Sequence, residues 1–157
     1  MHSRIFQLST SPVNADNYIA EEDYYDHWFT HQIADYVDDD CNREEDIQWL
    51  KAYSDGYDID QDNTGNYTLV VNSKEKYFKH SYEKFIRELE NIGRPTLEQF
   101  SKRIDLWNLN DACEDKYGFY VEYYDDCGHD LMTLDAFIRR CDICATYYLG
   151  GVVDYHY

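Results

Sequence analysis

The chain has 157 residues, of which 43% are hydrophobic, and a formal net charge of −18 from 32 acidic and 14 basic side chains. This hydrophobic fraction is enough for a core and excludes a disordered acidic tail, while the charge far exceeds the roughly 2–8 units that keep a small domain soluble. Direct binding to nucleic acid is therefore not expected, and a basic partner is the natural complement of the chain.

The first half of the chain is predicted to contain two strands, two helices and a returning strand. Residues 3–9 alternate as a first strand. From Glu21, apolar residues recur every three or four positions as far as Val37 and predict a helix that Asp38–Asp40 ends. A second helix is expected over residues 43–53. A hairpin follows, with strands at 57–61 and 67–71.

The second half is predicted to begin with the longest helix, from about Lys74 to Asn91, with Ser73 as its cap and Gly93 at its end. The elements expected after it are short helices near 96–103 and 105–115, a strand at 119–124, a helix near 133–141, and a strand from Thr146 to Tyr157 bulged at Gly150–Gly151. These elements predict the fold class α+β: a single compact domain over residues 1–157, with a small antiparallel or mixed sheet and about five or six helices.

Cysteine usage and hydropathy predict a cytoplasmic protein. The chain has five cysteines, and an odd number scattered along the sequence argues against a secreted disulfide framework. The first eight residues lack the apolar stretch of a signal peptide. No window approaches the roughly 18–20 apolar residues of a membrane span, so no membrane partner is expected.

The acidic residues are concentrated in the first two expected helices and the hairpin. Residues 15–62 hold sixteen acidic and two basic side chains, which gives that segment −14, whereas residues 73–103 carry +3 and residues 104–157 carry −8. Helical carboxylates at a rise of about 1.5 Å per residue can match the charge spacing of duplex DNA, which is about 1.7 Å per charge. The predicted partner-binding residues are Glu22, Asp23, Asp26, Asp35, Asp38, Asp39, Asp40, Glu44, Glu45 and Asp46.

Local structure offers a second explanation for part of this charge. Acids near a helix start interact favourably with the helix dipole, which applies to Asp40, Glu44, Glu45 and Asp46 before and in the expected second helix. That explanation does not account for the scarcity of Lys and Arg among the acids. We therefore favour a functional acidic face.

No pattern of catalytic residues stands out, and no enzyme activity or cofactor is predicted. The chain has no glycine-rich phosphate loop, nucleophile elbow or His-Glu-x-x-His motif. Cys127, His129, Cys141 and Cys144 are of the types that bind zinc in two close pairs, so a small zinc-stabilised domain stays open as an alternative. Free cysteines that are simply buried explain the same residues.

The end of the chain resembles a known family. The segment Leu134-Asp135-Ala136-Phe137-Ile138-Arg139-Arg140, followed by a strand ending Val153-Asp154-Tyr155-His156-Tyr157, is similar to the end of ArdA-type antirestriction proteins. Small acidic chains rich in Tyr and Asp also resemble anti-CRISPR inhibitors of phages and mobile elements. The resemblance implies a DNA-mimicking inhibitor, often dimeric, that occupies the DNA groove of a restriction or CRISPR enzyme. It assigns a role to no residue.

The sequence thus predicts an acidic inhibitor that mimics nucleic acid and binds a basic DNA-binding protein or nuclease. The alternative to this mimic is an immunity- or adaptor-type protein that binds its partner through a patch of tyrosines, with the acids only steering association. The chain holds 17 Tyr, enough for either a core or such a patch.

Overall fold

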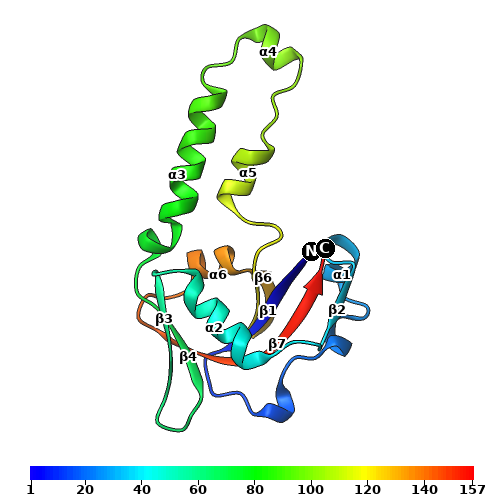
Figure 1. Ribbon diagram of the computed structural model, residues 1–157, viewed down its shortest axis with the longest axis vertical. Coiled ribbons are helices and arrows are strands. Elements are labelled where there is room, and N and C mark those ends of the chain that lie inside the picture. Colours follow the sequence, from blue (N-terminus) through cyan, green and yellow to red (C-terminus); the bar gives the residue numbers. More distant parts are fainter.

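A seven-stranded mixed sheet organises the chain, as the computed structural model of residues 1–157 shows (Figure 1). Six strands follow the order β3-β4-β7-β1-β5-β6, and β2 also pairs with β7. The strands are β1 (His2–Ser9), β2 (Tyr36–Asp38), β3 (Tyr57–Gln61), β4 (Tyr67–Val71), β5 (Tyr120–Asp125), β6 (Gly128–Thr133) and β7 (Thr146–His156). Six α-helices are present, so the predicted α+β class is confirmed.

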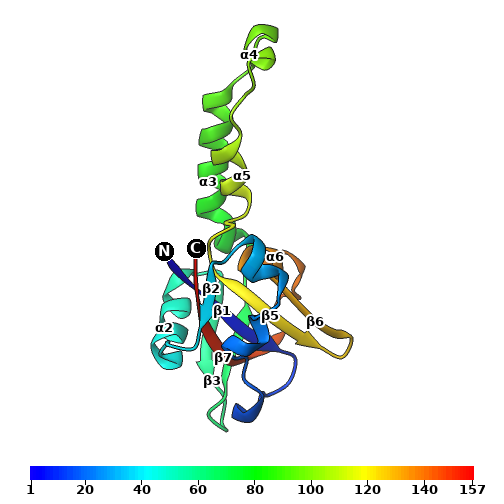
Figure 2. The same cartoon turned by 90° about the vertical axis from the view of Figure 1, so that its right-hand side faces the viewer.

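The two central strands, β1 and β7, come from opposite ends of the chain and run antiparallel. β1 pairs in parallel with β5 on its other side. The second edge of β7 is shared, because β4 pairs with Thr146–Tyr148 and β2 pairs with Asp154–His156. The first and last residues of the chain therefore lie side by side (Figures 1 and 2).

Apolar side chains alternate along the central strands and bury both faces of the sheet. Phe6 and Leu8 of β1 belong to a core of 18 buried residues, which α2 (Arg43–Tyr53) and α6 (Leu134–Arg140) cover. Ile5 belongs to a second core of ten on the other face, which the segment from Ile19 to Val37 covers. The acidic N-terminal segment is thus anchored to the sheet by its apolar side chains.

The predicted bulge at Gly150–Gly151 is confirmed. Between the pairs Phe6–Val152 and Leu8–Leu149, two residues of β7 lie opposite the single residue Gln7. The Gln7 Oε1 atom accepts a hydrogen bond from Gly151 N at 2.8 Å, and a Cβ on Gly150 would overlap the Gln7 side chain. Glycine is required at the next position, because a Cβ on Gly151 would lie 2.8 Å from the backbone nitrogen of Ile19.

A helical hairpin projects from the sheet as an arm. It consists of α3 (Lys74–Ile92), α4 (Leu97–Ser101) at the tip and α5 (Trp107–Cys113), which returns beside α3 (Figures 1 and 2). The long helix is confirmed almost to the residue. Its cap is also confirmed, because Ser73 Oγ accepts from Lys76 N at 3.2 Å. Gly93 follows the helix with a φ of 60°, a conformation that glycine adopts easily.

The predicted helix between Glu21 and Val37 is wrong. Three short elements occupy that segment: the 3₁₀ helix η2 (Glu21–Tyr24), α1 (Trp28–Gln32) and β2. His27 interrupts the chain, because it is extended and its ring accepts a hydrogen bond from Phe29 N at 3.3 Å, which caps α1. Val37 then pairs with β7 as a strand, in keeping with its β-branched side chain.

Candidate functional site

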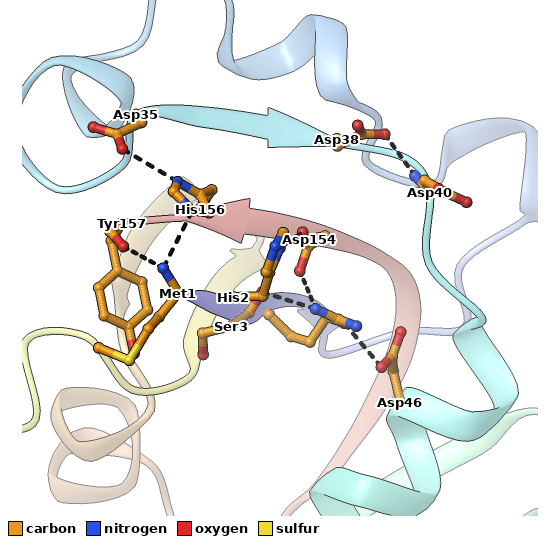
Figure 3. Close-up of polar contacts among 11 residues, drawn as sticks. Met1, His2, Ser3, Asp35, Asp38, Asp40, Asp46, Asp154, His156 and Tyr157 are labelled. Atoms are coloured by element: carbon orange, nitrogen blue, oxygen red, sulfur yellow. Dashed lines mark hydrogen bonds and ion pairs between the residues drawn. The ribbon is translucent and has the colours of Figure 1, made fainter.

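The two ends of the chain meet in a network of polar contacts at the β2 edge of the sheet (Figure 3). The Met1 amino group donates to the Tyr157 carbonyl oxygen at 2.5 Å and lies 3.2 Å from His156 Nε2. His156 Nδ1 lies 3.2 Å from Asp35 Oδ2, and its ring stacks on Tyr36. These contacts fix the position of β2 and of the carboxylates beside it.

Beneath this network lies a buried cluster of charges (Figure 3). Asp46 and Asp154 are 6% and 5% exposed, and both pair with Arg4. The Arg4 Nε atom lies 2.8 Å from Asp46 Oδ1 as an ion pair, but neither Arg4 Nε nor Asp46 Oδ2 makes a hydrogen bond. His2 Nδ1 contacts Asp154 from the rim at 2.6 Å. One guanidinium therefore forms ion pairs with two buried carboxylates. These pairs link α2 to β1 and β7.

This cluster corrects one predicted partner-binding residue. Asp46 is on the inner side of α2 and is committed to Arg4, so it cannot contact a partner. Acids in the first turn of a helix are also stabilised by the helix dipole, which is sufficient reason for Asp46 to lie there. The role of Asp46 is to hold the fold together.

The other nine predicted residues lie at or near the surface and form what we call the acidic edge. They come from four places: η2, the turn after it, β2 with its flanking residues, and the first turn of α2. The nine residues are Glu22, Asp23, Asp26, Asp35, Asp38, Asp39, Asp40, Glu44 and Glu45, of which Asp38 is half-buried and the others exposed. Most of these carboxylates are not on the helices expected from the sequence, because α1 spans only Trp28–Gln32 and contains no acid, and only Glu44 and Glu45 lie on α2.

Hydrogen bonds connect the segments of the acidic edge. Glu21 N donates to Asp39 Oδ1 at 2.8 Å, which joins η2 to the loop after β2, and Asp40 N donates to Asp38 Oδ1 at 2.7 Å. Partial burial raises the pKa of the Asp39 carboxyl, and the negative charges of Glu21, Glu22 and Asp38 raise it further. Carboxylates that are distant in sequence therefore lie close enough to repel one another.

The two cations of residues 15–62 are both engaged within the protein. The Arg43 guanidinium donates to the Gly150 carbonyl at 2.6 Å and the Leu149 carbonyl at 2.9 Å, and it also contacts Glu44. Lys51 pairs with Asp60 at 3.0 Å. Apart from Glu44, no residue of the acidic edge pairs with Lys or Arg, so its charge stays available to an external cation.

Large aromatic side chains lie exposed among these acids. Tyr25, Trp28 and Tyr36 are 60%, 43% and 46% exposed. The Tyr25 hydroxyl donates to Glu21 Oε1 at 2.6 Å, and this hydrogen bond is the main reason that the pKa of Tyr25 is raised to about 12. The edge thus combines carboxylates with aromatic surfaces, a mixture suited to binding a protein.

A second carboxylate–histidine pair lies at the opposite edge of the sheet, and sequence patterns did not indicate it. Glu122 is 4% exposed, its Oε1 lies 2.6 Å from His129 Nδ1, and its Oε2 accepts from the Tyr24 hydroxyl at 3.3 Å. The His129 ring stacks on Tyr124. Alternation along β5 and the hairpin register could have predicted that Glu122 and His129 are neighbours, had β6 been recognised.

The four candidate zinc ligands do not converge. Nowhere in residues 1–157 are three or more His, Cys, Asp or Glu side chains arranged to hold a metal ion. Cys127 and Cys144 are exposed, whereas Cys141 is buried at the end of α6 with Sγ 3.3 Å from the Ile138 carbonyl. The zinc-stabilised domain has no geometric support.

Hydropathy and similarity add two findings. Helix α3, though the longest, is too polar to cross a membrane, and no other helix has the length and apolar character to do so. No protein-family model, curated protein or solved structure matches the chain. The function of the acidic edge and of the arm therefore has to be inferred from the charge, exposure and contacts of their residues.

Proposed function

We propose that the protein is an inhibitor that mimics nucleic acid and places its acidic edge in the basic DNA-binding groove of a host-defence nuclease of the restriction or CRISPR type. One observation carries this proposal: the carboxylates of the acidic edge that come from η2, from β2 with the loop after it, and from the first turn of α2 lie at or near the surface and, apart from Glu44, have no Lys or Arg partner. Neither an enzymatic activity nor direct binding to nucleic acid is proposed.

Charge explains why such an edge favours a DNA-binding groove over other protein surfaces. A groove lined with Lys and Arg binds phosphates, and its affinity falls steeply as salt rises. Carboxylates held by backbone hydrogen bonds, as at Asp38 and Asp39, are pre-organised for the same cations. Association should then be fast, dependent on ionic strength and in competition with DNA.

The test is the triple substitution of Asp38, Asp39 and Asp40 by Asn. Asn keeps the side-chain oxygens that accept from Glu21 N and Asp40 N, so the loop should fold normally. Inhibition of DNA cleavage by the target nuclease, first captured on immobilised protein and eluted with duplex DNA, is expected to weaken at least about tenfold, since charge pairs at an interface are commonly worth more than 1.4 kcal/mol.

The matched control removes the same charge from the far edge of the sheet. Asp125, Asp126 and Asp130 are exposed on or between β5 and β6, and their substitution by Asn should change inhibition less than about twofold. Equal losses in the two triple variants, or binding that neither salt nor DNA weakens, would reject nucleic-acid mimicry.

A second candidate function is an adaptor or immunity-type protein that binds through aromatic side chains. The exposure of Tyr25, Trp28 and Tyr36 beside the acids favours it. In that case Tyr25→Ala and Tyr36→Ala should weaken binding far more than the triple Asn variant, and the affinity should survive high salt.

A further inference from the structure

Helix α3 carries a seam of apolar residues that its own chain covers only in part, since Tyr82 and Leu89 of the seam are exposed and its other members are half-buried. Phe78, Tyr82, Phe85, Leu89 and Ile92 are spaced by four, three, four and three residues. This is the 3.5-residue repeat with which a helix contacts a partner helix along one line. The repeat extends over most of the helix, from its fifth residue to its last.

Helix α5 is too short to be that partner along the full seam. At 1.5 Å per residue the 19 residues of α3 extend about 28 Å, whereas the seven residues of α5 extend about 10 Å. No residue between Tyr77 and Ala112 is buried, although this segment contains most of the arm. An apolar hollow of about 390 Å³ lies between the two helices, lined in part by Phe78, Tyr82, Phe85 and Ala112.

The uncovered apolar surface is large enough for a stable association. The exposed large apolar side chains of the arm are Tyr82 at 63%, Leu89 at 45%, Leu97 at 84%, Phe100 at 69%, Leu106 at 44% and Trp107 at 61%. With roughly 150–250 Å² for each aromatic side chain, these six expose several hundred Å². A stable interface buries about 800 Å² per partner, so the arm supplies most of one.

The distribution of charge favours a second copy of this chain as the partner that covers the seam. The arm, residues 74–113, holds eight basic and seven acidic side chains and is nearly neutral at +1, whereas the rest of the chain carries −19. Two copies that met through any other surface would bring together two strongly negative bodies. The arm is the one extended surface through which identical chains can approach without that repulsion.

We propose that two copies pair through their arms, with the α3 seams facing each other and the helices antiparallel, so that four helices form a bundle. Parallel pairing would place both acidic bodies at the same end of the bundle. Antiparallel pairing separates them by about the 28 Å length of α3, well beyond the roughly 8 Å over which charges interact at physiological salt. This inference does not depend on the proposed function, because the acidic edge lies outside the arm (Figure 1).

Sedimentation equilibrium of the full chain tests the pairing. The wild-type protein should have twice its chain mass of 18.8 kDa at physiological salt. Leu89→Glu puts a carboxylate into the seam of each copy and should weaken association at least about 100-fold, because a buried unpaired charge is strongly unfavourable. Small-angle X-ray scattering of the dimer should show two separated bodies at the ends of a narrow rod.

The matched control is Asn91→Glu. It adds the same charge two residues later, about 200° around α3 from Leu89, and should change association less than about twofold. Tyr82→Glu serves as a second seam variant if circular dichroism shows that Leu89→Glu loses helix. A wild-type monomer at all concentrations overturns the proposal, whether or not that monomer binds anionic lipid vesicles. Scattering that shows adjacent bodies overturns the antiparallel arrangement.

Discussion

Above about pH 10 the protein is expected to unfold within roughly one pH unit, because its buried tyrosines cannot ionise while it is folded. Of the six tyrosines that are at most 8% exposed, five have a pKa raised well above the usual value, mainly by burial, and a hydroxyl that donates: Tyr24, Tyr57, Tyr77, Tyr120 and Tyr155. Each hydroxyl also donates a hydrogen bond, for example from Tyr57 to the Leu50 carbonyl at 2.6 Å. An ionised tyrosine would lose that bond and place a negative charge against the acceptor.

The sign of the effect follows from the difference between the pKa of each tyrosine in the folded chain and its ordinary pKa, about 10, in the unfolded chain. Below pH 10 these hydroxyls are protonated in both states, so they contribute their full stability. Above pH 10 they release protons only when the chain unfolds, so stability falls by about 1.4 kcal/mol per pH unit for each group. Five groups together give about 7 kcal/mol per pH unit, which approaches the 5–15 kcal/mol that stabilises an ordinary domain.

Alkaline unfolding followed by circular dichroism, together with the ultraviolet absorbance of tyrosinate, measures this directly. The absorbance of the buried tyrosines should appear in the same step as the loss of structure. Tyr57→Phe should reduce the steepness of the pH dependence by about one fifth, whereas Tyr82→Phe, which is 63% exposed, should leave it unchanged. Smooth titration of all tyrosines with the fold intact would contradict the prediction.

Replacing Arg4 with Met is expected to lower the free energy of unfolding by about 3–5 kcal/mol, because it leaves two buried carboxylates without a cation. Asp46 and Asp154 approach Arg4 from α2 and β7, and Trp49 lies over the guanidinium at 5.7 Å. Methionine fills similar space but supplies no charge. Urea denaturation at neutral pH measures the loss.

The control for this variant is Arg140→Met. Arg140 is exposed and lies 3.4 Å from the equally exposed Asp130, so its loss should cost less than about 1 kcal/mol. Adding Asp154→Asn to Arg4→Met should recover part of the stability, since one of the two unpaired charges is then removed. Equal stability of the Arg4 and Arg140 variants would show that the buried cluster is not important for the fold.

Local signals in the sequence predicted most of the elements. The β3–β4 hairpin has the predicted bounds, and α2 and α3 agree within one residue, because each has a clear period and a cap or turn at its ends. Segment 21–37 was misread because its apolar residues also fit a helical period. The deciding interaction there, the pairing of Val37 with Tyr155, joins distant parts of the chain and leaves no local signal.

The sequence predicted which residues contribute to the candidate site but not how those residues are arranged. Counting charges identified the acidic residues, and nine of the ten predicted residues lie at or near the surface. Asp46 could not be recognised as buried, because its partner Arg4 is 42 positions away in the sequence. No local pattern indicates that α2 packs beside the strand that carries Arg4. The arm was missed for a related reason, since an apolar stripe in a sequence does not reveal whether anything covers it.

The pairing of β1 with β7 also determines how the protein can fold. The hydrogen bond between Gln7 and Gly151 joins residues 144 positions apart, at the centre of the sheet. Local units such as the β3–β4 hairpin, the α3–α5 hairpin and the β5–β6–α6 segment can form early, but none contains the central pair. Closing so long a loop is entropically costly and slows folding. We therefore expect refolding to be limited by the docking of these preformed units onto β1 and β7, a late step in which both faces of the sheet are buried together.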